Sequence, residues 1–353
     1  MMTNLAAGRA ADRIMDMAAD TAAGSQEMLT ITDLKTHFFT QRGVVPAVDG
    51  VTIRIPEKQV MGIVGESGCG KSVTAMSILQ LVSRPGRIVG GSIMLDGEEL
   101  VGKSIKEMRD IRGNKVSVIF QEPMTSLNPV YTVGRQVSEA ITVHRHVGKQ
   151  EARQQVIEMF KAVGIPEAER RFNSFPHQLS GGLRQRVMIA MAMVCQPKLM
   201  IADEPTTALD VTIEAQILHL MRRLEEKSNT SIMLITHNMG VVAEICDFVY
   251  VMYAGKVMEQ APVFELFDHT KHPYTKGLLN SIPKPTEEKQ RLYNIKGMVP
   301  NLLRLPKGCR FSPRCEYAMP ECREREPELY DCGKNHKVRC FLYQKDQGGG
   351  ADE

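Results

Sequence analysis

The alternation of apolar and polar residues predicts two kinds of strand in this chain. Residues 28–60 alternate, as half-buried strands do. Three later runs are apolar throughout, which is typical of parallel strands buried on both faces. These runs are residues 60–64, 199–202 and 232–235. Helix-like segments lie between them, so the pattern predicts an α/β core.

The remaining pattern divides the chain into parts. Asp96-Gly97 after an apolar run predicts a hairpin turn. Residues 116–120 form a short apolar strand pattern, and prolines become frequent after about residue 262. The expected parts are a mobile leader or short amphipathic helix at 1–27, a core at 28–262 with an antiparallel β subdomain and a helical insertion at about 122–195, and an extension at 263–353.

A glycine-rich loop follows the first apolar run. The stretch from Gly65 to Ser72 reads G-E-S-G-C-G-K-S and fits the phosphate-binding pattern G-x-x-x-x-G-K-[ST]; a plain glycine-rich turn is the alternative. Glycines let backbone N–H groups turn toward phosphate oxygens, and the following helix N-terminus adds positive potential. Lys71 can reach the β- and γ-phosphates, and the Ser72 hydroxyl can bind Mg²⁺. The expected nucleotide contacts are Gly65, Glu66, Ser67, Gly68, Cys69, Gly70, Lys71, Ser72 and Val73.

Two further features carry candidate chemistry. The apolar run 199–202 ends in Asp203 and Glu204. We expect Asp203 to hold Mg²⁺ through water and Glu204 to polarise the attacking water. Ser180, Gly181 and Gly182 open a helical stretch and leave backbone N–H groups free for an anion, although such a start is often only a helix cap.

In this order, the motifs resemble those of the nucleotide-binding subunit of an ABC transporter. Residues 179–183 match the family signature loop, with Leu183 where glutamine is commonest. The resemblance assigns Gln121 to a Mg²⁺-contacting loop, and His237 to the γ-phosphate switch. It also places Asp210 in the inter-subunit loop 208–210. The resemblance assigns the adenine-stacking aromatic to Phe38, with Phe39 as the second choice. It implies a dimer that sandwiches two ATP molecules head to tail, with Lys71, Gln121, Glu204 and His237 as catalytic residues.

Two stretches near the C-terminus narrow the resemblance. His272-Pro273-Tyr274-Thr275 and residues 301–309 resemble the D-type ATPase subunit of oligopeptide permeases. This implies an ATPase for oligopeptide or dipeptide import, peripheral to the cytoplasmic face of the inner membrane. Its implied partners are an F-type ATPase in a heterodimer, two membrane permeases and an extracytoplasmic peptide-binding protein. The alternatives are import of a nickel chelate or glutathione, or an ABC ATPase outside transport, which usually carries paired ATPase units or long coiled coils.

The cysteines gather near the C-terminus. Thiolates at Cys309, Cys315, Cys322 and Cys340 predict an iron–sulfur cluster or zinc, and Cys332 is spare. No C-x₂₋₄-C knuckle is present, and the resemblance favours [4Fe–4S]; uncommitted thiols are the third alternative. A separate expectation concerns Cys69, which we predict to be ionised because it lies at a helix N-terminus beside Lys71.

Charge and hydropathy argue against a nucleic-acid partner, a membrane span and a signal peptide. The chain has 353 residues and a formal net charge of +3, so we expect no nucleic-acid partner. No apolar stretch approaches the ~18 residues of a membrane span. Charged residues near the N-terminus stand where a signal peptide needs an apolar run, so we expect a cytoplasmic protein.

Overall fold

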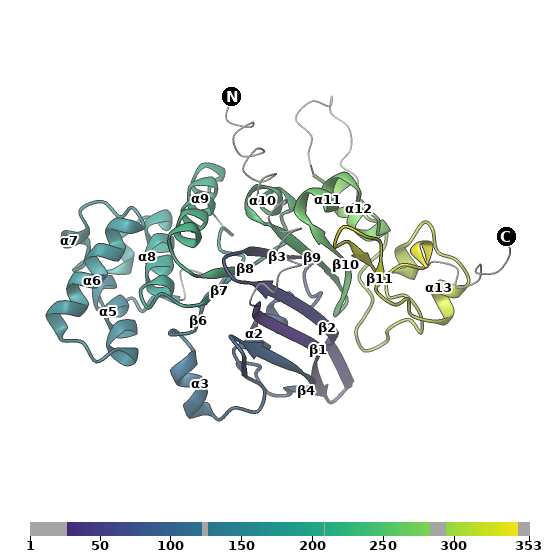
Figure 1. Ribbon diagram of the computed structural model, residues 1–353, viewed down its shortest axis with the longest axis horizontal. Coiled ribbons are helices and arrows are strands. Elements are labelled where there is room, and N and C mark those ends of the chain that lie inside the picture. Colours follow the sequence, from purple (N-terminus) through teal and green to yellow (C-terminus); the bar gives the residue numbers. More distant parts are fainter. Residues whose placement is uncertain (1–26, 122–125, 208, 283–293, 345–353) are drawn as a thin grey trace, which may run out of the picture.

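The computed structural model describes residues 27–121, 126–207, 209–282 and 294–344. The expected leader lies outside these residues, except for Glu27. The described chain is built on two sheets, with helices on their faces and a group of helices to one side (Figure 1). The predicted apolar strands and the turn at Asp96-Gly97 are confirmed.

The larger sheet has eight strands in the order β11-β12-β10-β9-β3-β8-β7-β6. Its centre is parallel from β9 to β6, which brings the C-terminal ends of these strands to one edge. Ligands of open α/β sheets bind at such an edge. The strands are β3 (Val60–Val64), β6 (Val116–Ile119), β7 (Leu199–Asp203), β8 (Ser231–Thr236), β9 (Phe248–Tyr253), β10 (Lys256–Pro262), β11 (Tyr330–Asp331) and β12 (Lys337–Val338).

The smaller sheet is antiparallel and has the order β2-β1-β4-β5. Its alternating side chains place Leu29, Ile31 and Ile53 in a core shared with one face of the larger sheet. Helix α2 (Lys71–Ile78) packs between the two sheets. The strands are β1 (Glu27–Thr40), β2 (Gly43–Pro56), β4 (Gly86–Leu95) and β5 (Glu98–Glu99).

The other helices cover the larger sheet or form the lateral group. The lateral helices are α5 (Val133–His144), α6 (Lys149–Ala162), α7 (Ala168–Arg171) and α8 (Gly181–Met193), with the 3₁₀ turn η1 (Pro176–Gln178). The remaining ones are α3 (Ile105–Ile111), α9 (Val211–Lys227), α10 (Met239–Ile245), α11 (Val263–Asp268) and α12 (Pro273–Asn280). Among the described residues, no helix is long and apolar enough to cross a membrane.

Residues 294–344, here called the tail segment, contain little regular structure. Its elements are η2 (Ser312–Arg314), α13 (Glu321–Glu324), β11, β12 and η3 (Phe341–Tyr343). Strand β12 pairs with β10, so the tail segment extends the edge of the larger sheet. The buried Glu259 carboxylate accepts a hydrogen bond from the Lys271 N–H at 2.7 Å and lies 2.7 Å from His336 Nε2. These contacts hold the tail segment and the start of α12 on the core.

Candidate nucleotide-binding site

The loop between β3 and α2 has a conformation that requires glycine. Gly65 and Gly70 adopt φ values of +153° and +107°. A Cβ on Gly65 would lie 2.1 Å from the Met252 carbonyl oxygen, and one on Gly70 would lie 2.5 Å from the Ala47 oxygen. The glycines therefore allow the loop to wrap tightly against neighbouring strands, as a phosphate-binding loop does.

Lys71 lies inside this loop, and its side chain is buried. Its Nζ donates hydrogen bonds to the carbonyl oxygens of Gly65 at 2.6 Å and Glu66 at 3.2 Å. These bonds replace water around the ammonium and hold its charge at the centre of the loop. Ser67 and Gly68 at the tip are exposed, and Val73 is half-buried at the start of α2. The loop thus has an exposed tip, with one buried cation held at its centre.

Ser72 and Asp203 form the candidate Mg²⁺ site. Asp203, at the end of β7, is 6% exposed and takes a hydrogen bond from Ser72. Burial raises the pKa of Asp203 above its ordinary value, although the Ser72 bond opposes the change. A hydroxyl and a nearby carboxylate fit Mg²⁺, which usually takes one or two protein ligands and completes its shell with phosphate and water.

Glu204 is the hub of a polar cluster at the same edge. Its Oε1 lies 2.9 Å from His237 Nδ1, while Oε2 accepts from Gln121 Nε2 at 2.9 Å and from Thr207 Oγ1 at 3.1 Å. Burial alone would raise the pKa of Glu204, but its bonds to His237 and Thr207 lower it overall. An ionised carboxylate that meets a histidine and an amide can orient a water molecule. The catalytic roles themselves stay predictions.

Thr207 is a member of this cluster that the sequence analysis missed. It stands three residues after Glu204, and the turn that follows β7 brings its hydroxyl back onto the carboxylate. A threonine in a turn carries no distinguishing pattern, so only the folded geometry reveals this contact.

The expected ionised state of Cys69 is corrected by the structure. Cys69 is 1% exposed. Burial raises the pKa of its thiol, and the nearby Lys71 only partly offsets this effect. The helix N-terminus and Lys71 do lie beside Cys69 and favour the thiolate, but desolvation outweighs them and keeps the thiol protonated.

The predicted signature and inter-subunit residues lie at the starts of α8 and α9. Ser180 caps α8 and its Oγ accepts from the Leu183 N–H at 3.4 Å. Gly182 faces α9, since a Cβ there would lie 3.1 Å from Ile213. Gly181 is half-buried, and Asp210 is exposed at the start of α9. In the described part of the chain, no hydrogen bond joins these residues to the phosphate loop, so their roles stay predictions.

The two candidate adenine-stacking residues have different surroundings. Phe38 is half-buried in β1, and its ring packs so closely on Gly86 that a Cβ there would lie 2.6 Å from it. Phe39 is 39% exposed, and the Arg87 guanidinium lies 4.3 Å from its ring centroid. The assignment to Phe38 stays a prediction.

The predicted iron–sulfur cluster in the tail segment is wrong, and its zinc alternative is also unsupported. Across the described ranges, no group of three or more His, Cys, Asp or Glu side chains is arranged to hold a metal ion. Burial raises the pKa of Cys309 to about 12 and that of Cys340 to about 11, so both side chains are neutral thiols in the metal-free chain. The cysteines Cys309, Cys315, Cys322 and Cys340 instead line an apolar cavity of about 10 Å³.

Comparison with protein families identifies the class of this chain. Residues 48–207 match the model of the ABC transporter family, and residues 258–322 match that of the oligopeptide/dipeptide transporter C-terminal region. The chain is 52% identical over 320 residues to the oligopeptide transport ATP-binding protein AppD of Bacillus subtilis, covering 90% of this chain and 98% of that protein. It belongs to the ABC transporter ATP-binding family.

Two further likenesses refine this assignment. The chain is 45% identical to the dipeptide transport ATP-binding protein DppD of Escherichia coli, over 91% of this chain and 98% of that one. It also resembles the post-hydrolysis dimer of the cassette MJ0796 bound to ADP and Pi, with a TM-score of 0.60 and 26% identity. That match covers 67% of this chain and 99% of the other. The predicted ABC ATPase fold is therefore confirmed.

Proposed function

We propose that this chain is the ATP-hydrolysing subunit of an ABC importer that energises uptake of oligopeptides or dipeptides. The observation that carries the proposal is that Lys71 of the phosphate loop lies close enough to Asp203 and Glu204 to act on their carboxylates. The later residues of the same chain match the oligopeptide/dipeptide transporter region. The relatives named for oligopeptide and dipeptide transport support this cargo class.

The described residues supply the parts of a hydrolytic site. The loop N–H groups and Lys71 would bind and neutralise the phosphates, while Ser72 and Asp203 would hold Mg²⁺. A Mg²⁺ ion held there would stabilise the charge that develops on the phosphate oxygens. Glu204 accepts a proton from water, and His237 and Gln121 hold its carboxylate in place. Positioning and electrostatics then carry the catalysis.

Four residues outside the phosphate loop, of which Ser180 and Asp210 are exposed and the two glycines half-buried, suit a second subunit. Ser180, Gly181, Gly182 and Asp210 are proposed to close over the ATP of a partner ATPase of the F type. Two membrane permeases and an extracytoplasmic peptide-binding protein complete the proposed importer, with this chain peripheral to the cytoplasmic face of the inner membrane. We further propose the division into a 28–262 ATPase domain and a 263–353 extension, of which the structure describes residues 263–282 and 294–344.

Uptake by a reconstituted transporter tests this proposal. The chain is co-expressed with the neighbouring permease and ATPase genes, purified as a complex and placed in vesicles with the binding protein. ATP is expected to drive accumulation of a labelled peptide, and unlabelled peptides are expected to compete while nickel chelates and glutathione do not. Uptake of either non-peptide cargo in preference to peptide would refute the proposed cargo, and a complex with two copies of this chain would refute the heterodimer.

A further inference from the structure

A carboxylate belonging to the phosphate loop is held by the tail segment. Glu66, the second residue of the loop, accepts bonds from Arg314 Nη1 at 2.6 Å and from Arg314 Nη2 at 3.1 Å. The Arg314 side chain is only 4% exposed, while that of Glu66 is 29% exposed. The pair joins residues 248 positions apart in sequence. A two-pronged contact of this kind fixes both the charge and the direction of the carboxylate.

The backbone of Glu66 is also bound by a residue of α12, a later part of the chain. Its N–H donates to the Tyr274 hydroxyl at 2.9 Å, and Tyr274 is fully buried. The Tyr274 ring lies 4.7 Å from that of Tyr253 and 5.4 Å from that of Phe311. Phe311 immediately precedes η2, which carries Arg314. An aromatic cluster therefore fixes η2 beside the phosphate loop.

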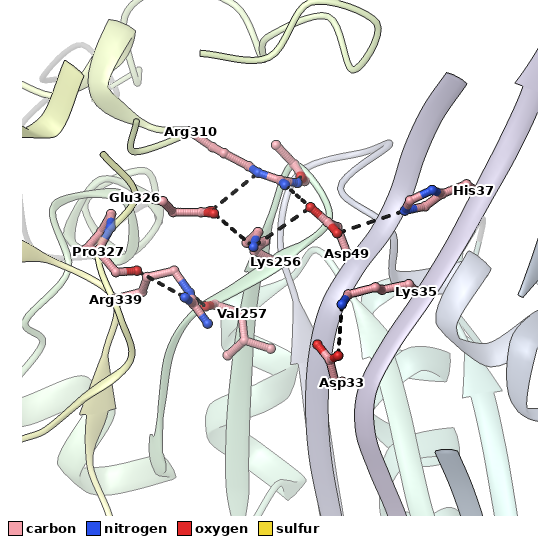
Figure 2. A network of polar contacts seen from close by, with 11 residues as sticks. Asp33, Lys35, His37, Asp49, Lys256, Val257, Arg310, Glu326, Pro327 and Arg339 are labelled. Atoms are coloured by element: carbon pink, nitrogen blue, oxygen red, sulfur yellow. Dashed lines mark hydrogen bonds and ion pairs between the residues drawn. The ribbon is translucent and has the colours of Figure 1, made fainter. Parts of the chain in front are cut away.

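A second arginine anchors the same turn to the core (Figure 2). Arg310 donates to the Ala254 carbonyl oxygen and pairs with Asp49 on β2. Its Nε lies 3.6 Å from Glu326 Oε1, and Lys256 bridges Glu326 at 2.9 Å and Asp49 at 3.8 Å. Because Arg310 lies two residues before η2 and Arg314 is the last residue of η2, this network limits the movement of Arg314 away from Glu66.

Arg314 pairs with the Glu66 carboxylate, whose negative charge would otherwise act on a bound nucleotide. Phosphate groups bound by the loop are strongly negative, and an unpaired carboxylate on the loop would repel them. We propose that Arg314 is a positioning residue for nucleotide binding: it neutralises Glu66 and holds it away from the phosphates, so that the tail segment sets the affinity of the site for ATP. This inference rests on the proposed function, because it requires the loop to bind nucleotide.

The repulsion depends on ligand charge, which distinguishes it from a purely structural role. Loss of Arg314 should lower the affinity for ATP most, the affinity for ADP less and the affinity for adenosine hardly at all. Removing the carboxylate should cancel the effect, so Glu66→Gln is expected to rescue an Arg314 variant. A structural defect would instead weaken all three ligands alike and would not be rescued.

The test measures affinities of the purified full chain for ATP, ADP and adenosine by displacement of a fluorescent ATP analogue. Arg314→Met is expected to lose about tenfold in ATP affinity and clearly less in ADP affinity, and Arg314→Met/Glu66→Gln to recover most of the loss. Arg314→Lys keeps the charge but loses the two-pronged contact, so it is expected to lose less than about tenfold in ATP affinity. The matched control is Arg325→Met, because Arg325 pairs with Glu321 inside the tail segment.

The outcomes separate the inference from the function on which it rests. Wild-type affinity in Arg314→Met, or an equal loss for all three ligands without rescue, overturns the role of Arg314 while the ATPase assignment stands. Failure of the wild type to bind ATP overturns both. If Arg314→Met does not fold, an ATP affinity in Arg314→Lys more than tenfold below that of the wild type overturns the neutralising role.

Discussion

Residues 65–72 and the cysteines from Cys309 to Cys340 both suggested a binding site by their spacing, yet they differ in how their geometry arises. The loop is shaped by its own backbone, because Gly65 and Gly70 adopt conformations and approaches that no other residue permits. The cysteines stand in a segment with little regular structure, and their positions depend on packing. Spacing therefore predicted the site that backbone conformation makes. In the tail segment it predicted cysteines that do meet around one apolar cavity, but among the described residues they are not arranged to hold a metal ion.

The largest expected effect concerns Glu204. Glu204→Gln keeps the shape of the side chain but removes its basicity, so ATP turnover should fall by about 10²–10⁴-fold while ATP binding persists. Phosphate release by the assembled transporter is the measurement. Glu226→Gln is the matched control, because Glu226 is exposed on α9. Turnover near the wild-type rate in Glu204→Gln would remove Glu204 from the chemistry.

Lys71 supplies the next largest effect. Lys71→Ala removes the cation held by the Gly65 and Glu66 carbonyl oxygens, so ATP affinity should fall by roughly 10–100-fold. Titration with a fluorescent ATP analogue measures the change. Lys227→Ala, at the exposed end of α9, controls for the loss of a lysine. Equal affinities in wild type and Lys71→Ala would contradict the placement of the phosphates.

The order in which thiols react sharpens the comparison between the two regions. Cys69 is 1% exposed with a raised pKa, whereas Cys332 in the tail segment is half-buried. We expect maleimide to modify Cys332 at least about tenfold faster than Cys69 in the native protein. Peptide mass spectrometry after timed quenching measures both rates, and denatured protein provides the control. Faster modification of Cys69 would show that the loop is more open than described.

The smallest effect is a change in the pH dependence of stability. Burial alone would raise the pKa of Asp49, but Lys256 and Arg310 lower it below its ordinary value of 3.8. A lowered folded-state pKa stabilises the protein above that ordinary value, and this stabilisation is lost as pH falls through the folded-state value. Arg310→Met should therefore reduce the free energy of unfolding by about 1–3 kcal/mol at neutral pH, with a smaller deficit near pH 3.

Urea unfolding at neutral pH and at about pH 3 measures this difference. The control is Arg54→Met, since Arg54 forms an exposed pair with Glu27. A deficit in Arg310→Met that is the same at both pH values would assign the loss to packing rather than to the charge of Asp49.

Local patterns predicted the centre of the fold well. Runs of apolar residues located β3, β7 and β8, because strands buried on both faces consist mainly of apolar side chains. The contact of Glu204 with Gln121 was beyond such patterns, since the two residues are 83 positions apart. Arg314 was missed for the same reason: an arginine in a proline-rich stretch carries no local sign of its partner. The thiolate predicted at Cys69 failed because burial is a property of the whole fold.

The most direct test of the central claim is peptide-stimulated ATP hydrolysis by the reconstituted transporter. Vesicles contain the chain with the proposed partner ATPase and the two proposed permeases, and phosphate release is followed before and after addition of peptide-loaded binding protein. The account predicts that peptide raises the rate several-fold over the unloaded binding protein, and that Glu204→Gln in this chain suppresses the stimulated rate. A rate unaffected by peptide, or one that survives Glu204→Gln, would contradict it.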